Sequence, residues 1–450
     1  MGGVRALRVC FAATFLIIVA SASFVWLQRP NVWSPERQIS NGSGDSRLVD
    51  AAADNSGGLH VVWEDNRANL QQVYYKQSLD NGLTWSQEVE LSNLSYATID
   101  PLPRVAFNAN RIFVFFSGGT DNGEQLFEVT SNQTESSFSR QEQITNDPGY
   151  QTNPSVAVVG NTIHLVWERY ANGMEHIYYM RSADGGATWQ PAIPLTQSSA
   201  QDRHPTIFAV NRNVFVAWDR FNDGLEALFF LASFDGGATW QPEVQVSQYA
   251  PPVLSIFPSI ASNGTYVYTV WNLGQVLYSR SIDAGATWST PVALTNESRQ
   301  YLSPRISESG GWLRVVTAAI NSGTQGGISS DIYYLESSNA GKDWTPPISI
   351  TPPSGRFSLS PAIAVRNDNI FVAWEDNRNG HFAIFFVSKP NFFQLQTLQG
   401  QLSIDSVAAL AVATAVYLIL EARWRHRRRI RVRRLHRQRR KSGASRRVRR

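Results

Sequence analysis

The chain repeats a pattern of short hydrophobic runs separated by polar turns. One type of run mixes aromatic and β-branched residues and ends in tryptophan, at Trp63, Trp167, Trp218, Trp271 and Trp374. A second type follows it, at 73–76, 177–180, 228–231 and 332–335. A third run comes later, as at 191–196, and a fourth opens with a proline. Four short strands per unit, joined by Gly, Asn and Asp turns, are typical of a β-propeller blade.

An octapeptide recurs at one place in these units. Copies of Ser-x-Asp-x-Gly-x-Thr-Trp stand at 78–85, 182–189, 233–240 and 281–288, and degenerate copies stand at 131–138 and 337–344. Successive copies are about fifty residues apart. Repeats of this length build propellers, solenoids or arrays, so the whole middle of the chain is predicted to be one repeat architecture.

Counting the second strands predicts seven units, in which Phe116 and Thr317 replace the tryptophan of the second and sixth. The seventh unit opens at Pro361 and holds only three strands. Its fourth strand is predicted at 33–40, which matches the fourth-strand segment 288–295. Such closure removes the open sheet edge between the first and last blades. We therefore predict an all-β, seven-bladed β-propeller over residues 31–390, with a six-bladed ring as the alternative.

The octapeptides resemble the Asp-box, or BNR repeat, of the sialidase superfamily, over about 360 residues. The resemblance implies a sialidase-like propeller, usually of six blades, in which this turn joins the third and fourth strands away from the active site. The aspartate is suited to accept turn N–H groups, and the tryptophan to pack between blades. We therefore expect structural roles for Asp80 and Trp85, Asp184 and Trp189, Asp235 and Trp240, and Asp283 and Trp288.

A carboxylate follows the tryptophan directly in four units, with an arginine close behind; the carboxylates are Glu64, Glu168, Asp219 and Glu375. Two interpretations stay open. The carboxylates could pair with arginines of their own or the next blade and hold the turns, or they could form a ring of charges that binds a polar ligand such as a glycan. The first and seventh units share Trp-Glu-Asp-Asn-Arg and would be neighbours in a closed ring. They predict a ligand-binding patch of Asp65, Arg67, Asp376 and Arg378.

A sialidase of the resembled family would need three arginines that hold a substrate carboxylate, a tyrosine nucleophile paired with glutamate, and an aspartate as acid and base. Arg104 and Arg305 stand at comparable starts of inner strands, and Tyr301 lies close to Arg305 in the sequence. These three are the candidate catalytic residues. Neither arginine stands in the full Phe-Arg-Ile-Pro segment that the resemblance implies, so the sequence leaves enzyme activity open and favours a binding role.

Metal and cofactor chemistry receives no support from the sequence. The one cysteine, Cys10, lies in the first apolar segment, so the rest of the chain can form neither a disulfide nor a thiolate metal site. The histidines lack metal-ligand spacing, and neither phosphate loops nor nucleophile elbows occur. We predict no metal and no cofactor.

Charge is distributed unevenly along the chain. Of 40 Lys and Arg residues, three lie in residues 1–30 and 16 in residues 421–450, which leaves 21 in the middle against 35 of the 36 acidic residues. The predicted propeller is therefore acidic and would repel a phosphate backbone. We expect no nucleic acid partner.

Both ends predict membrane topology. Residues 1–27 combine arginines, an apolar run and the small-x-small site Ala20-Ser21-Ala22, as in a signal peptide, although the apolar stretch is also long enough for an uncleaved anchor. Residues 391–401 form a linker, and 402–420 an apolar segment long enough to span a bilayer. The basic segment 421–450 follows it directly and is predicted to stay in the cytoplasm along anionic lipids.

These observations predict a single-pass membrane protein, or a two-pass one with an uncleaved N-terminal segment, whose propeller faces outward. Absence of disulfides in an exported domain favours a prokaryotic source. The predicted function is binding of a glycan or protein at the cell surface. An exo-α-sialidase type of glycoside hydrolase is the first alternative, and an extracytoplasmic assembly or scaffold protein is the second; fold alone does not choose among them.

Overall fold

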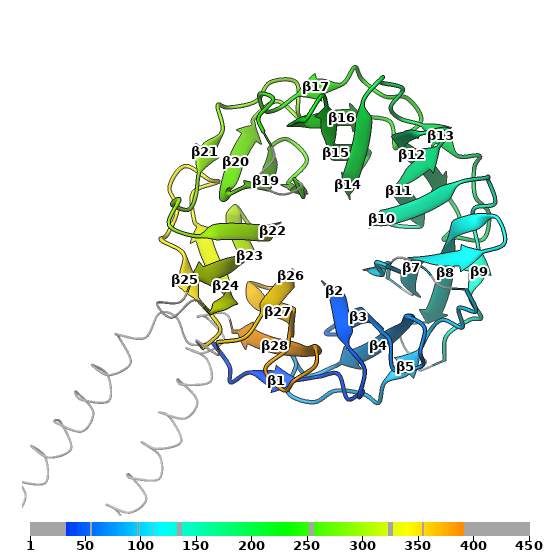
Figure 1. The fold of residues 1–450 in the computed structure, drawn as a ribbon. Coiled ribbons are helices and arrows are strands. Elements are labelled where there is room, and N and C mark those ends of the chain that lie inside the picture. The colour runs from blue at the N-terminus through cyan, green and yellow to red at the C-terminus, as the bar shows by residue number, and fades with distance from the viewer. Residues whose placement is uncertain are drawn as a thin grey trace, which may run out of the picture. The chain divides into compact units, whose positions relative to one another are not determined.

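A computed structural model describes residues 33–390, with gaps at 55, 97, 99, 110, 133–136, 252–255, 323–326 and 353–354. Seven four-stranded antiparallel sheets stand around a central axis (Figure 1). The described chain is thus an all-β, seven-bladed propeller, and the prediction of seven blades is confirmed. The predicted segments 1–27, 391–401, 402–420 and 421–450 lie outside the described residues. Within the described part, no helix is long and apolar enough to cross a membrane.

The blades follow one another along the chain, each running from its inner to its outer strand. Blade 1 holds β2 (Ser46–Ala53), β3 (Leu59–Asp65), β4 (Gln72–Ser78) and β5 (Val89–Glu90). Blade 2 holds β6 (Arg104–Phe107), β7 (Arg111–Thr120), β8 (Gly123–Asn132) and β9 (Glu142–Gln143). Blade 3 holds β10 (Tyr150–Val159), β11 (Thr162–Ala171), β12 (Met174–Ser182) and β13 (Ile193–Pro194).

The remaining blades repeat this order. Blade 4 holds β14 (Gln201–Val210), β15 (Asn213–Asn222), β16 (Leu225–Ser233) and β17 (Val244–Gln245). Blade 5 holds β18 (Ser259–Ser262), β19 (Val267–Leu273), β20 (Gln275–Ser281) and β21 (Val292–Ala293). Blade 6 holds β22 (Gln300–Ser309), β23 (Trp312–Ser322), β24 (Ile328–Ser337) and β25 (Ile348–Ser349). Blade 7 holds β26 (Ser358–Arg366), β27 (Asn369–Asp376), β28 (Ala383–Lys389) and β1 (Arg37–Gln38).

The first strand of the chain closes the ring. β1 pairs with β28, opposing Arg37 to Phe386. Just before it, the Ser34 N–H donates to the Ser388 carbonyl over 2.7 Å, and just after it, the Ile39 N–H donates to the Ile384 carbonyl over 2.8 Å. The predicted closure by the N-terminal segment is therefore confirmed.

The core lies between the blades rather than inside any one of them. Each hydrophobic cluster of the described residues combines residues of two neighbouring blades, for example Trp63 of blade 1 with Phe386 of blade 7. The second strands are buried on both faces, which explains their continuous apolar character. The fully buried Trp63, Trp167, Trp218, Trp271 and Trp374 all lie there.

The octapeptides form turns between the third and fourth strands, held by their own side chains. In blade 4, Asp235 Oδ1 accepts the Thr239 N–H over 2.9 Å, and Asp235 Oδ2 accepts the Thr239 hydroxyl over 2.6 Å. Asp80, Asp184 and Asp283 make the same two bonds in their own turns. These bonds lower the pKa of Asp184 and of Asp283 to about 2.

The octapeptide tryptophan packs edge-on against an aromatic ring of the preceding blade. Trp240 meets Tyr179 with ring centroids 5.0 Å apart, and Trp288 meets Phe230 at the same distance. Trp85 contacts Phe386 across the closure, and Trp189 contacts Phe115. The turns therefore join neighbouring blades, and we call the face on which they lie the octapeptide face. The opposite face, where the first strands begin and the second and third strands are joined, is the pocket face.

Candidate functional site: a central pocket

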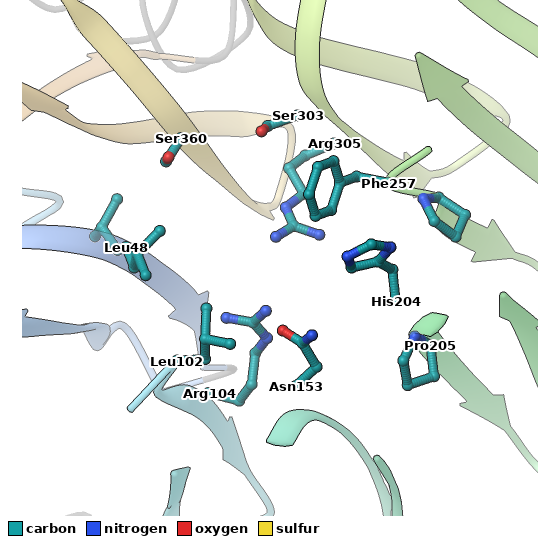
Figure 2. Close-up of a pocket in the computed structure, with 12 residues that line it drawn as sticks. Leu48, Leu102, Arg104, Asn153, His204, Pro205, Phe257, Ser303, Arg305 and Ser360 are labelled. Carbon is teal, nitrogen blue, oxygen red and sulfur yellow. The ribbon is translucent and has the colours of Figure 1, made fainter. Parts of the chain in front are cut away.

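One pocket lies on the axis of the ring, because every blade contributes to its lining. The equivalent residues of the seven blades are Leu48, Leu102, Asn153, His204, Phe257, Ser303 and Ser360, joined by Arg104 and Arg305 (Figure 2). Its volume of about 220 Å³ is below the ~300–1,000 Å³ of drug-sized sites. The pocket therefore suits one charged group or one sugar ring.

An irregularity at the start of the first strand aims these residues inward. Six of them have positive φ: Leu48, Leu102, Asn153, His204, Ser303 and Ser360. A register shift accompanies the conformation in blades 1, 3, 4, 6 and 7. A left-handed conformation in a residue other than glycine costs about 1–3 kcal/mol and persists only where the surroundings enforce it. In blades 2 to 7 a proline follows directly, and at this bulge its missing N–H is tolerated.

The carboxylates that follow the tryptophans hold these strained residues. Glu375 of blade 7 accepts the Leu48 N–H of blade 1 over 2.9 Å. Glu64 likewise accepts the Leu102 N–H, and Glu168 accepts the His204 N–H, each from the next blade. Burial, with the charges of Asp100 and Glu375, raises the pKa of Glu64 to about 8. Three of the four carboxylates thus join neighbouring blades beneath the pocket, which favours their structural interpretation.

The four residues predicted as a ligand-binding patch are bonded within their own blades. The Arg67 guanidinium donates to Asp65 over 2.6 Å and to Glu88 over 2.6 Å. In blade 7, Arg378 donates to Asp376 over 2.6 Å and also bonds Glu36. Both aspartates are fully buried, and these bonds outweigh burial and lower the pKa of each. Neither pair lines the central pocket, and their bonds hold the turns within each blade, so a ligand-binding role for these four residues stays a prediction.

Two arginines converge in the pocket from opposite parts of the sequence (Figure 2). Arg104 donates to the carbonyl of its neighbour Pro103 over 3.1 Å, and neither it nor Arg305 forms an ion pair within the described part of the chain. Burial and the charge of Arg104 lower the pKa of Arg305 to about 10, although Asp50 opposes this. Two unpaired guanidinium groups therefore share one small cavity.

His204 adds a third polar group. Its Nδ1 lies 2.6 Å from Asp219 Oδ1, and Phe257 packs against the ring with centroids 4.3 Å apart. Burial lowers the pKa of His204, but the Asp219 carboxylate outweighs burial, so the net pKa is raised. Because Asp219 occupies Nδ1, the other ring nitrogen is left for a ligand, and Figure 2 shows the ring bordering the same cavity as the arginines.

Tyr301, the third candidate catalytic residue, lies outside the pocket. Its side chain is buried, with its ring 6.1 Å from that of Tyr333, while Arg305 reaches the cavity. The pocket lining contains neither a tyrosine nor a carboxylate. The geometry therefore brings together Arg104 and Arg305 and leaves Tyr301 apart.

Sequence reasoning missed the seven equivalent lining residues, among them Asn153, His204 and Phe257. The signal was nevertheless in the sequence for all of them except Leu48, because each of the other six directly precedes a proline that opens a first strand. The prolines marked the strands, whereas the residues before them form the pocket wall.

Comparisons with known proteins identify the fold. No family model matches the sequence, and no curated protein matches it. A solved polysaccharide lyase, an ulvan lyase, aligns over 80% of this chain and 99% of its own, with 12% identity and a TM-score of 0.56. A Trypanosoma rangeli sialidase in complex with 2,3-difluorosialic acid aligns over 79% of this chain, with 13% identity and a TM-score of 0.46, and this chain spans 55% of its length.

A Streptococcus pneumoniae NanB sialidase variant aligns over 78% of this chain and 70% of its own, with 15% identity and a TM-score of 0.44. Identities this low demonstrate a similar fold and nothing finer. Of these three, the ulvan lyase has a TM-score above 0.5, and it shows that the chain has a β-propeller fold similar to that of a solved protein.

Proposed function

We propose that this protein binds an acidic glycan at the cell surface through the central pocket of its propeller. The proposal rests on one observation: the guanidinium groups of Arg104 and Arg305 meet in a cavity whose lining holds no carboxylate. Asp50 acts on Arg305 only from outside that lining, and neither arginine forms an ion pair among the described residues. Two like charges in a confined site repel each other, and a carboxylate or sulfate group between them would remove that repulsion and accept their hydrogen bonds.

The rest of the pocket fits a saccharide better than an isolated small anion. Asn153, His204, Ser303 and Ser360 offer hydrogen-bond donors and acceptors to hydroxyl groups, and Phe257 offers an apolar ring face. The propeller as a whole carries an excess of acidic residues, which disfavours nucleic acid as the anionic partner. The solved polysaccharide lyase with a similar propeller supports a saccharide ligand.

The proposed location is outside the membrane, with the chain anchored by 402–420 and its basic tail in the cytoplasm. Support comes from the sequence of both ends and from the direction of two strands. β28 ends at Lys389 on the octapeptide face, and Ser34 enters beside Ser388 on the same face. The chain therefore leaves the propeller opposite the pocket, which suits a pocket directed away from the membrane.

Hydrolysis of the bound glycan is not part of the proposal. A retaining glycosidase needs two catalytic groups about 5–5.5 Å apart across the scissile bond. The pocket supplies arginines to hold an anion, but its lining offers no carboxylate as acid or nucleophile. The two arginines would serve a sialidase as well as a binding protein, so a fluorogenic sialic-acid glycoside belongs in the test.

The test measures binding of carboxylated, sulfated and neutral glycans by the full-length protein in detergent, using isothermal titration calorimetry. We expect binding of an acidic glycan that weakens about 10–100-fold in Arg104→Ala and in Arg305→Ala, because each removes a charge-assisted hydrogen bond of about 1.5–3 kcal/mol. Arg140→Ala, at an exposed site remote from the pocket lining, is the matched control. Equal binding of neutral and acidic glycans would contradict the proposal, and turnover of the sialoside lost in both pocket variants would replace it with hydrolysis.

A further inference from the structure

Two exposed tyrosines stand at the pocket-face end of blade 3. Tyr150 opens β10 and Tyr170 lies near the end of β11, and the two are register partners. The two residues remain 47% and 43% exposed, and their ring centroids are 6.4 Å apart with the planes tilted by 52°. Within the described chain, no hydrogen bond engages either hydroxyl group. The pair is thus an open aromatic surface with polar rims.

The blade fold does not require this pair. At the corresponding positions, blade 4 pairs Gln201 with Phe221 and blade 6 pairs Gln300 with Ile320. These blades keep the same strands and register shift with a polar residue where blade 3 has Tyr150. A tyrosine pair left exposed on one blade alone among these three therefore points to a contact with something outside the propeller.

The tyrosine pair lies close to the central pocket along β10. Asn153, which lines the pocket, follows Tyr150 by three residues on β10, a span of about 10 Å along a strand. Two linked sugar rings cover such a span. Glu175, the register partner of Tyr170 on β12, lies beside the tyrosines, and its carboxyl group interacts electrostatically with His204 of the pocket lining. The path from pocket to rim therefore alternates hydrogen-bonding groups with aromatic faces.

Sugar rings bind proteins through this combination. The axial C–H groups of a pyranose form an apolar face that stacks on an aromatic ring, while the hydroxyl groups at its edge need polar partners. Tyrosine provides both in one rigid side chain, with little conformational entropy lost on binding.

We infer that the ligand is an acidic oligosaccharide or polysaccharide, with one acidic unit in the central pocket and a neighbouring sugar stacked on Tyr150 and Tyr170. The inference rests on the proposed function and deepens it. A protein that recognises one terminal sugar needs only the pocket. The tyrosine surface would add binding energy for a glycan that continues over blade 3.

The experiment compares ligands of increasing length. Calorimetry on the full-length protein in detergent would use galacturonic acid, its trimer and its hexamer, and a sulfated galactose series of the same lengths. We expect the trimer to bind about tenfold more tightly than the monomer in the wild type, a gain of about 1.4 kcal/mol. The Tyr150→Ala/Tyr170→Ala variant should lose this gain and keep the affinity for the monomer.

Two further variants separate stacking from indirect effects. Tyr150→Phe/Tyr170→Phe keeps both rings and should keep most of the length dependence. Tyr266→Ala removes a tyrosine of 39% exposure beside Asn263, in the turn before β19 on the octapeptide face, and should change nothing. Thermal melting of each variant reports whether it folds.

The outcomes distinguish the two proposals. Equal affinity for monomer and trimer in the wild type, with monomer binding that still depends on Arg305, would overturn the tyrosine subsite and leave acidic-glycan binding intact. A length-dependent gain that survives in the double alanine variant would also overturn the subsite. Failure of every member of both acidic series to bind would refute the proposed function, and the subsite with it.

Discussion

At the residue scale, the pocket brings together two side chains of like charge and a histidine that a carboxylate holds. Arg104 and Arg305 repel, and no described carboxylate pairs with either. His204 differs, because Asp219 Oδ1 lies 2.6 Å from its ring nitrogen. A bound anion would therefore gain most from the arginines, while His204 would tune the affinity with pH. The charged groups that act on His204 are Asp219, Glu168, Arg203 and Glu175.

This arrangement predicts a pH dependence of anion binding. The pKa of His204 is raised above its usual 6.5. The ring is therefore positive at pH values below the raised pKa, and it loses its charge as the pH rises through that pKa. Affinity for a sulfated glycan, whose own charge is constant, should fall by about tenfold over that range. This loss corresponds to the lower end of the range for one hydrogen bond to a charged group. A second loss should occur near pH 10, where Arg305 titrates.

Calorimetry between pH 5.5 and 10.5 measures this profile, with His204→Gln as the comparison. The variant should lose the step at lower pH and keep the alkaline one. A step at lower pH that persists in His204→Gln would assign it to another group and contradict the prediction.

At the scale of the strand and turn, the octapeptide joins two blades through a close approach of backbone to side chain. Gly237 has a φ of +80°, and a Cβ atom placed there would lie 1.9 Å from the Tyr179 hydroxyl of the preceding blade. Gly236 has nearly the same φ, +77°, and its nearest neighbour would be 4.0 Å away. Alanine substitutions at the two glycines would therefore separate the cost of backbone strain from the cost of steric conflict.

Gly236→Ala should therefore lower the free energy of unfolding by about 1–2 kcal/mol, the strain of a left-handed alanine. Gly237→Ala adds overpacking, which typically costs 1–3 kcal/mol more, and should lower it by about 2–5 kcal/mol. Urea unfolding followed by tryptophan fluorescence measures both. Equal losses in the two variants would mean that Tyr179 yields easily and that the contact contributes little to joining blades 3 and 4.

The repeat made the blades predictable from sequence, including those in which Phe116 and Thr317 replace tryptophan, because a period of about fifty residues survives the loss of any single residue. The central pocket was less accessible. Arg104 and Arg305 were found by their positions at strand starts, but His204 was not, because a residue before proline is ordinarily extended. Its inward aim depends on a φ of +51°, which Glu168 of the neighbouring blade helps to hold.

The aspartate and arginine pairs were open to two interpretations for a related reason. Asp65, Arg67, Asp376 and Arg378 occur in a repeated Asp-Asn-Arg turn, and a repeated charge pattern suits either an exposed ring or a set of internal bonds. Only the partners decide between them, and Glu88 and Glu36 lie on or beside the outermost strand segments, far from the turns in sequence.

At the scale of the whole molecule, closure by β1 brings both ends of the described propeller to one face. Ser34 and Ser388 bond there, on the side of the octapeptide turns, while the pocket opens on the other. Only twelve residues, 390–401, separate the end of β28 from the predicted membrane segment, and an extended chain covers at most ~3.3–3.6 Å per residue. Under the proposed topology, the octapeptide face must therefore stay within about 40 Å of the bilayer.

This geometry predicts which face approaches the lipid. Cys10 is the only cysteine, so a Cys10→Ala background allows one fluorophore at Ile282→Cys, on an octapeptide turn, or at Leu225→Cys, at the pocket-face start of β16. Ile282 and Leu225 are 63% and 38% exposed, so both sites can be labelled. In vesicles that carry nitroxide-labelled headgroups, the probe at 282 should be quenched more strongly, because nitroxide quenching acts only at short range. Stronger quenching at 225 would mean that the pocket faces the membrane. It would then contradict the binding of a long glycan, because a polysaccharide passing over blade 3 needs open solvent above Tyr150 and Tyr170.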